Sequence, residues 1–156
     1  MRDACLKLGE DAWQGRTSQA HTDVRAFIAL LKRRARGEDI PEGWVPETTF
    51  WVLDGDVVGG DVELRLPLNE WLNQVGGNIG YFTHPAHRNR GVATFAFREG
   101  LRMLHGRGLH KALATCLDDN VASIRILEKA GGVRIEDAKY DGPPRRRYLI
   151  LRLRSG

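Results

Sequence analysis

Two arginines and a glycine share the run Arg88 to Ala93, which follows a strand-like stretch and opens an apolar-periodic helix. Gly91 lets the backbone turn tightly and come close to a ligand. The free N–H groups of a helix's first turn, at the positive end of the helix dipole, attract phosphate oxygens, and Arg88 and Arg90 add forked donors. The pattern predicts an anion site, with phosphate as the expected group. Taken alone, it is equally typical of a plain strand-to-helix turn.

A second polar stretch begins at Asn120, ahead of a helical pattern over residues 120–130 that ends at Gly131. Asp118 or Asp119 is expected to cap this helix. The amide of Asn120 would then lie in the first turn, where it can both donate and accept hydrogen bonds. Considered on its own, this stretch favours the alternative, in which Asn120 serves only as a cap.

Several histidines invite a catalytic or metal-binding interpretation: His84, His87, His105 and His110. Their spacings match no metal-ligand pattern, and His84 and His87 adjoin the expected phosphate loop. Cys5 and Cys116 have no metal-type spacing either. We therefore expect no metal site, and we expect Cys116, in an apolar strand-like run, to be a buried small hydrophobic residue.

Hydrophobic periodicity predicts the elements that must position these residues. Apolar residues spaced three to four apart predict helices, and β-branched, aromatic or alternating runs predict strands. The expected helices run from Thr22 to Gly37 and over residues 92–105 and 120–130, with one short turn at 69–74. The expected strands cover residues 48–53, 56–66, 79–83, 112–117, 133–135 and 147–153. Residues 1–20 have no clear pattern.

Turn residues mark several of these boundaries. Thr22 or Asp23 is expected to cap the first helix and Gly37 to end it. Residues 54–55, an Asp-Gly pair, predict a hairpin, and the two glycines at 59–60 predict a bulge. The order helix, three strands, helix, strand, helix, two strands predicts a mixed α/β sheet with helices packed on it.

The composition is that of one globular domain. The chain has 156 residues, 42% hydrophobic and 28% charged, with a net charge of +4, which allows a full core and argues against disorder. The basic balance suits an anionic ligand, but the motifs of nucleic-acid-binding proteins are missing. No apolar run reaches the ~20 residues that span a bilayer, and no signal-peptide pattern is present. Cysteine usage fits a reducing cytosol, so we expect a cytoplasmic protein with no nucleic-acid or membrane partner.

Together, the two motifs and the element order resemble the GNAT superfamily of N-acetyltransferases, and an uncharacterised bacterial branch in particular. The first motif matches the Arg/Gln-x-x-Gly-x-Gly/Ala signature at Arg88, Gly91 and Ala93. The second resembles the Asn-x-x-Ala/Ser…Glu-Lys-x-Gly signature at Asn120, Ser123, Glu128, Lys129 and Gly131. The resemblance covers about residues 47–153. It implies an α/β (α+β) fold of the acyl-CoA N-acyltransferase type, with a mixed, mostly antiparallel central sheet and helices on both faces.

Acetyl-CoA is the cosubstrate that the resemblance implies. Main-chain N–H groups of residues 88–93 would hold its pyrophosphate, and the backbone of residues 81–83 would pair with the pantetheine arm. Asn120 would hydrogen-bond that arm, and the N–H of Tyr81 would polarise the acetyl carbonyl. The implied binding residues are Tyr81, Phe82, Thr83, Arg88, Asn89, Arg90, Gly91, Val92, Ala93, Asn120 and Ser123.

Two of the departures from the family pattern concern proton transfer. Many relatives carry a tyrosine in the last helix that protonates the departing sulfur, and that position here is Leu127. Many also carry a glutamate before the first motif as general base, and that position here is Asn78. Polar groups able to order an amine or water remain: Glu63, Asn69, Glu70 and Tyr81. We take Tyr81, Glu63 and Glu70 as the catalytic candidates, with a surface or structural role as the alternative for each.

The resemblance predicts a single-domain enzyme over residues 1–156 that transfers acetyl directly to a primary amine of a small molecule or peptide. Residues 63–71 and 137–147, outside the cofactor motifs, would form the acceptor face. The oligomeric state stays open, with a homodimer as one option. The departures at Asn78 and Leu127 motivate the alternative of a catalytically weak acyl-CoA-binding regulatory module.

Overall fold

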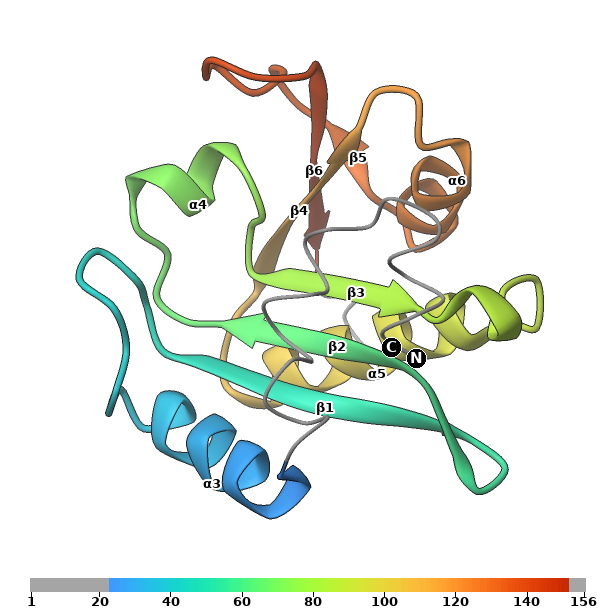
Figure 1. The fold of residues 1–156 in the computed structure, drawn as a ribbon. Coiled ribbons are helices and arrows are strands. Elements are labelled where there is room, and N and C mark those ends of the chain that lie inside the picture. Colours follow the sequence, from blue (N-terminus) through green and yellow to red (C-terminus); the bar gives the residue numbers. More distant parts are fainter. Residues whose placement is uncertain (1–22, 152–156) are drawn as a thin grey trace.

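The computed structural model describes residues 23–151, and the expectation for residues 1–20 lies outside that range (Figure 1). The helices are α3 (Val24–Ala35), α4 (Glu70–Gln74), the 3-10 turn η1 (Pro85–His87), α5 (Val92–Gly106) and α6 (Val121–Lys129). The strands are β1 (Glu47–Asp54), β2 (Val57–Arg65), β3 (Ile79–Thr83), β4 (Lys111–Leu117), β5 (Val133–Arg134) and β6 (Arg145–Leu151). The predicted order of helices and strands is confirmed over the described residues.

The strands form two three-stranded antiparallel sheets, ordered β1-β2-β3 and β4-β6-β5. The two sheets meet where Gly77, just before β3, forms a single bridge with Ala114 of β4. Beyond this bridge β3 and β4 diverge, as Figure 1 shows. The fold class is therefore the expected one, but the central sheet is divided at the β3–β4 junction.

The core packs α5 against the first sheet and continues to β4, β6 and α6. In Figure 1, α5 runs behind β1 to β3. Val62 and Leu64 of β2 and Phe97 of α5 are almost fully buried there. Gly100 allows the helix and sheet to approach closely, because a Cβ at this position would lie only 2.6 Å from Cδ1 of Ile79. This contact fixes α5, and hence its N-terminus, against β3.

The opposite face of the first sheet is covered by α3. Phe27 of α3 stacks on Trp51 of β1, with ring centroids 6.5 Å apart. Polar residues of β2 point to this side because they alternate with the core residues along the strand; they are Asp61, Glu63 and Arg65, and all three are buried. Helices thus lie on both faces of the first sheet, as expected.

Most of the predicted turn chemistry is confirmed. Asp23 caps α3 by accepting a hydrogen bond from the N–H of Ala26 at 3.0 Å, and Gly37 follows the helix with a φ of +80°. The bulge is also present, because the register passes from Val52 opposite Gly60 to Leu53 opposite Val58.

For α6, the cap expected at Asp118 or Asp119 is wrong, and the alternative in which Asn120 caps the helix is confirmed. Asn120 itself is the N-cap, and its side-chain oxygen accepts a hydrogen bond from the N–H of Ser123 at 3.1 Å. The Asp118 carboxylate is instead paired with the guanidinium of Arg146 on β6. Asp119 belongs to the preceding turn, where its carbonyl accepts from the N–H of Val121.

Candidate active site

A cavity of about 520 Å³ lies between the end of β3, the start of α5 and the start of α6. We call it the β3–α5–α6 groove. It is lined by Tyr81, Phe82, Thr83, His87, Arg88, Asn89, Gly91, Val92, Ala93, Thr94, Asn120, Ala122, Ser123 and Ile126. The structure therefore brings together every binding residue expected from the sequence except Arg90, although Asn120 lies far from residues 81–93 in the chain.

The N-terminus of α5 opens into this groove without a side-chain cap. Gly91 is the N-cap residue, with φ +81° and ψ 0°, and it makes no capping hydrogen bond. Helices α3, α4 and α6 are each capped by an Asp or Asn side chain. The N–H groups of the first turn of a helix have no partner within that helix, so those of α5 are free to bind an anion.

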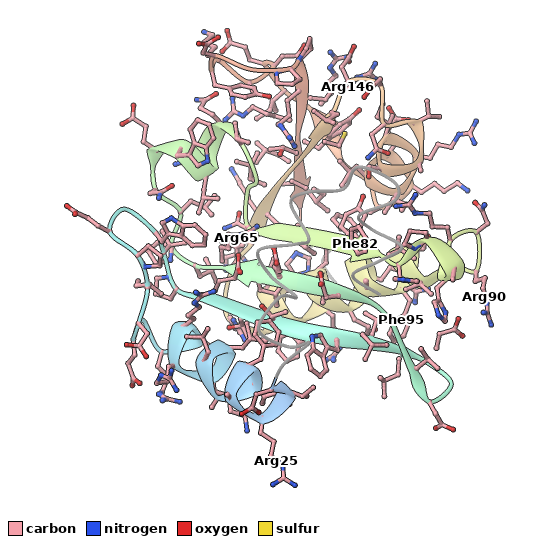
Figure 2. All side chains as sticks on the ribbon, viewed as in Figure 1. Arg25, Arg65, Phe82, Arg90, Phe95 and Arg146 are labelled. Carbon is pink, nitrogen blue, oxygen red and sulfur yellow. The ribbon has the colours of Figure 1, made fainter. Side chains whose placement is uncertain are left out.

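A carboxylate from the β1–β2 hairpin holds one wall of the groove. Asp54 Oδ2 lies 2.7 Å from His87 Nδ1 and 3.2 Å from Arg90 Nη1. The hydrogen bond with His87, helped by the charge of Arg90, lowers the pKa of the Asp54 carboxyl. Arg90 points outward at the edge of the molecule in Figure 2, which explains why it does not line the groove, whereas Arg88 does.

One edge of β3 faces the region where β3 and β4 diverge, and main-chain N–H and C=O groups point into that region. On its other edge β3 bonds to β2, with Arg65 N–H donating to the Asn78 carbonyl at 2.9 Å and His84 N–H donating to the Gly59 carbonyl at 2.8 Å. Because bonded and unbonded residues alternate along an antiparallel strand, the N–H and C=O groups of Tyr81 face away from β2. They are available to an extended ligand lying between β3 and β4.

The Tyr81 side chain packs inward, edge-on to Phe97 with ring centroids 5.5 Å apart. Burial raises the pKa of its phenol to about 12, and the neighbouring Ser123 opposes part of that rise. The two hydroxyls are nevertheless not in hydrogen-bonding geometry, and within residues 23–151 the Tyr81 hydroxyl has no hydrogen-bond partner. The phenol of Tyr81 is therefore protonated, and its oxygen is buried.

The two positions that depart from the family signature are both structural. Leu127 is 1% exposed and belongs to the core. Asn78 is also buried; its side-chain oxygen accepts from the N–H of Leu113 at 2.8 Å, and its nitrogen donates to the Arg65 carbonyl at 3.1 Å. Neither residue can act as a proton acceptor or donor toward a substrate in this arrangement.

The two glutamate candidates lie outside the groove. Glu63 is buried on β2, with its carboxylate 2.6 Å from Arg65 Nη2, and Arg65 Nε also contacts Glu47 at 2.6 Å. Glu70 is exposed at the first residue of α4. The Glu63 carboxylate lies beside Gly80 of β3, because a Cβ placed on Gly80 would be 3.4 Å from Glu63 Oε2.

The two segments expected to form the acceptor face contact one another. Trp71 of α4 packs edge-on to Tyr140 in the β5–β6 loop, with ring centroids 5.9 Å apart. The Lys139 N–H donates to the Gln74 side-chain oxygen at 2.9 Å. Thr115 on β4 completes the link, because its hydroxyl accepts from the Gly76 N–H at 2.9 Å.

Some lining residues escaped the sequence analysis as binding residues: His87, Thr94, Ala122 and Ile126. Ile126 is three residues from Ser123 on α6 and Ala122 is four residues from Ile126, so helical spacing that starts at Ser123 could have identified them. His87 directly precedes Arg88 in the sequence, but its position in the groove depends on Asp54 in a distant hairpin. Among residues 23–151 we find no cluster of histidine, cysteine or acidic side chains that could hold a metal, and no helix suited to crossing a membrane.

Comparison with known proteins identifies the family. The model of the acetyltransferase (GNAT) domain matches residues 8–133. No match is found among curated proteins.

Solved structures share the fold. A putative acetyltransferase from Salmonella typhimurium, solved with acetyl-CoA, is 16% identical, with 85% of this chain and 74% of that chain covered and a TM-score of 0.58. An N-acetyltransferase from Staphylococcus aureus is 16% identical, with 80% of this chain and 74% of that chain covered and a TM-score of 0.58. Mutant forms of the spermidine/spermine N-acetyltransferase SpeG from Vibrio cholerae are 22% identical, with 67% of this chain and 64% of that chain covered and a TM-score of 0.53. With the family model matching most of the chain, this protein belongs to the GNAT family of acetyltransferases.

Proposed function

We propose that this protein is an acetyl-CoA-dependent N-acetyltransferase that transfers acetyl directly to a primary amine of a small molecule or peptide. The observation that carries the proposal is the uncapped N-terminus of α5, which opens into a groove beside an edge of β3 that pairs with no strand among residues 23–151. A pyrophosphate suits the free N–H groups of that helix. An extended pantetheine arm suits a strand edge that lacks a partner.

The residues of the groove divide into three binding roles. Main-chain N–H groups from Arg88 to Ala93 would hold the pyrophosphate, with the Arg88 guanidinium adding charge. The outward-facing N–H of Tyr81 would stabilise the negative charge that develops on the acetyl oxygen as the amine attacks. Asn120, whose oxygen is already used to cap α6, still has its amide N–H groups to offer to the pantetheine arm.

The acceptor amine would approach from the side opposite the groove, where residues 63–71 and 137–147 adjoin. Their contact through Trp71 and Tyr140 supports this placement. The reaction forms a C–N bond, breaks the C–S bond and sends the electron pair to sulfur. The attacking amine must be deprotonated, since only its neutral form has a lone pair to share.

The proposal is tested by calorimetry with CoA and acetyl-CoA, followed by a thiol-release assay over a panel of primary amines. We expect binding of both ligands and release of free thiol with at least one amine class. Absence of CoA binding would contradict the proposal.

The structural roles of Asn78 and Leu127 favour one alternative, a catalytically weak acyl-CoA-binding regulatory module. Tight binding with no amine-dependent thiol release across the panel would support that alternative.

A further inference from the structure

Arg145 and Arg147 of β6 lie on the face of the second sheet that points away from α6. Side chains alternate between the two faces of a strand, and the next residue, Tyr148, reaches α6, where its hydroxyl lies 3.3 Å from the Glu128 carboxylate. The two arginines therefore share the opposite face with Thr115 of β4. Thr115 pairs with Arg147 in the register, and its hydroxyl lies 3.4 Å from Arg145 Nη1.

The charges of these two arginines are not neutralised by an ion pair among residues 23–151. Arg147 Nη1 donates to the main-chain carbonyl of Glu136 at 3.3 Å. The Glu136 carboxylate is instead 2.7 Å from Lys139 Nζ; that hydrogen bond lowers the pKa of Glu136, and the charge of Arg147 adds a smaller effect.

Part of each guanidinium is available to a ligand. Arg145 and Arg147 are both half-buried. Their Nε atoms are buried, whereas their Nη2 groups are not, and these Nη2 groups make no hydrogen bond among residues 23–151. Two like charges on one face repel each other, and an anion bound between them would relieve this repulsion.

Arg65 of β2, by contrast, already has its charge neutralised. It is 8% exposed, and its guanidinium contacts Glu47 and Glu63 at 2.6 Å. Its position nevertheless connects the two sheets, because a Cβ placed on Gly76 would lie 4.0 Å from Arg65 Nη1. The Gly76 N–H donates to the Thr115 hydroxyl at 2.9 Å. The turn between α4 and β3 thus contacts Arg65 on one side and the face that carries the two arginines of β6 on the other.

This turn leads into the strand that presents the proposed reaction centre. A Cβ placed on Gly80 would lie 3.2 Å from Arg65 Nη1, and Gly80 directly precedes Tyr81, whose N–H is proposed to stabilise the acetyl oxygen. An acceptor whose amine reaches this N–H would extend past Arg65 toward Arg145 and Arg147. Figure 1 shows α4 and α6 on opposite sides of β4 and β6, so this path lies on the α4 side.

We propose that Arg145 and Arg147 bind an anionic group of the acceptor, so that the substrate is a primary amine that also carries a carboxylate or a phosphate. A guanidinium presents its donors in a planar fork that matches the oxygens of either group. This inference rests on the proposed function and adds to it the class of acceptor. The two arginines determine specificity by orienting the acceptor, and they touch none of the reacting atoms.

Matched pairs of amines test the wild type first. The thiol-release assay compares γ-aminobutanoate with butylamine, and O-phosphoethanolamine with ethanolamine, at saturating acetyl-CoA and with rates corrected to the concentration of free amine. We expect kcat/KM to be about tenfold or more higher for the anionic member of at least one pair, as one charge-assisted hydrogen bond would give. The pair with the larger preference identifies whether the site takes a carboxylate or a phosphate.

Arg145→Gln and Arg147→Gln test the site itself. Each substitution keeps a polar side chain and removes the charge, so the ratio of kcat/KM between the anionic and the neutral amine should fall by about tenfold. The fall should come from a higher KM for the anionic amine, with kcat little changed. Lysine keeps the charge and loses the fork, so Arg147→Lys should retain an intermediate preference.

Arg134→Gln is the matched control. Arg134 of β5 pairs with Tyr148, so it lies on the face of the same sheet that points toward α6. Its guanidinium is also already bound to Asp137 at 2.8 Å. This variant should leave the ratio between anionic and neutral amines unchanged, and thermal unfolding of all variants would check that the fold is retained.

The outcomes distinguish a failure of the proposed function from a failure of this inference. If no amine releases thiol, the proposed function fails and this inference falls with it. If the wild type acetylates the neutral amines as well as the anionic ones, or if the preference survives in both glutamine variants, this inference alone is overturned. The comparison of amines in the wild type needs no substitution, so it decides even where a variant does not fold.

Discussion

Asn78 and Leu113 are joined by two hydrogen bonds at the junction of the two sheets. The Asn78 N–H donates to the Leu113 carbonyl at 2.8 Å, and the Leu113 N–H donates to the Asn78 side-chain oxygen at 2.8 Å. The Asn78 side-chain oxygen thus accepts the hydrogen bond from β4 that a main-chain carbonyl of a paired strand would otherwise accept. These two bonds and the bridge between Gly77 and Ala114 hold β4 against the start of β3. Beyond this point, no strand among residues 23–151 pairs with this edge of β3.

Replacing Asn78 by Asp should destabilise the protein without creating a catalytic base. The amide nitrogen donates to the Arg65 carbonyl at 3.1 Å, and an ionised carboxylate would instead place two acceptors face to face in a buried site. We expect a loss of roughly 1–3 kcal/mol in the free energy of unfolding, measured by urea denaturation. Asn73→Asp on the exposed side of α4 is the control and should change stability by less than ~0.5 kcal/mol. An Asn78→Asp variant as stable as the wild type would contradict this role.

Gly91→Val should weaken CoA binding more than its effect on stability explains. Gly91 has a positive φ, and space is open around its Cβ position, so the substitution adds backbone strain of about 1–2 kcal/mol and places a branched side chain in the groove. We expect a loss of at least about 1.5–3 kcal/mol in CoA affinity, the value of one charge-assisted hydrogen bond, measured by calorimetry.

Gly108 provides a matched control for this substitution. It follows the other end of α5 with a φ of +87°, also in open space. Gly108→Val should therefore cost similar stability while leaving CoA affinity unchanged. Equal CoA affinity in both variants would argue against the phosphate site at Gly91.

Two substitutions can separate the capping role of Asn120 from its proposed role in ligand binding. Serine is as good an N-cap as asparagine but lacks the amide N–H groups. Asn120→Ser should keep the stability of the wild type and weaken CoA by roughly 1 kcal/mol, whereas Asn120→Ala should in addition lose about 1 kcal/mol of stability. Thermal unfolding and calorimetry on both variants make the test, and unchanged affinity in Asn120→Ser would leave the residue as a cap alone.

Features with local causes could be predicted from the sequence, whereas features that depend on contacts between distant segments could not. Periodicity and turn residues located the elements because their causes are local, as with Asp23 capping α3 and Gly59 forming the bulge. For the cap of α6 the sequence left Asp118, Asp119 and Asn120 open, and Asp118 does not cap the helix because it is held by Arg146 on another strand. The sequence could not show that competition.

The same contrast between local and long-range causes applies to the candidate site. The residues of the first motif are consecutive, and their place at the helix start was predictable. The junction of the two sheets depends on the bonds between Asn78 and Leu113, and the placement of His87 depends on Asp54. Both relationships join segments distant in sequence. The orientation of the Tyr81 ring likewise depends on Phe97, a contact between β3 and α5.

Asp54→Asn should destabilise the hairpin and the adjoining wall of the groove in a pH-dependent way. The folded protein lowers the Asp54 pKa through His87 and Arg90. A lowered pKa means that the contribution to stability is complete above the unfolded value of 3.8 and is lost as the pH falls through the folded value. Thermal unfolding should show a lower Tm for Asp54→Asn at pH 7, with the difference closing only below about pH 4. Asp56→Asn in the same hairpin is the control. A lowering of Tm that has the same size and pH dependence in both variants would contradict the prediction.

The pH dependence of turnover should follow the acceptor amine. Asn78 is committed to the sheet junction and Leu127 to the core, so neither supplies a general base or acid. Glu63 is buried with one carboxylate oxygen bound to Arg65, which makes it a poor acceptor for an amine proton. The enzyme would then act only on amine that is already deprotonated, and its rate should rise with pH toward the pKa of that amine.

The measurement is a pH–rate profile for two accepted amines whose own pKa values differ by about one unit or more. Each profile should have its inflection near the pKa of its amine, so the two inflections should be separated by a similar interval. A base on the protein would impose one inflection at the same pH on both amines, because the titrating group would then belong to the enzyme. That result would contradict the argument from Asn78 and Leu127. It would make Glu63→Gln, Glu70→Gln and His84→Ala the variants to compare next, with the removal of the shared inflection identifying the base.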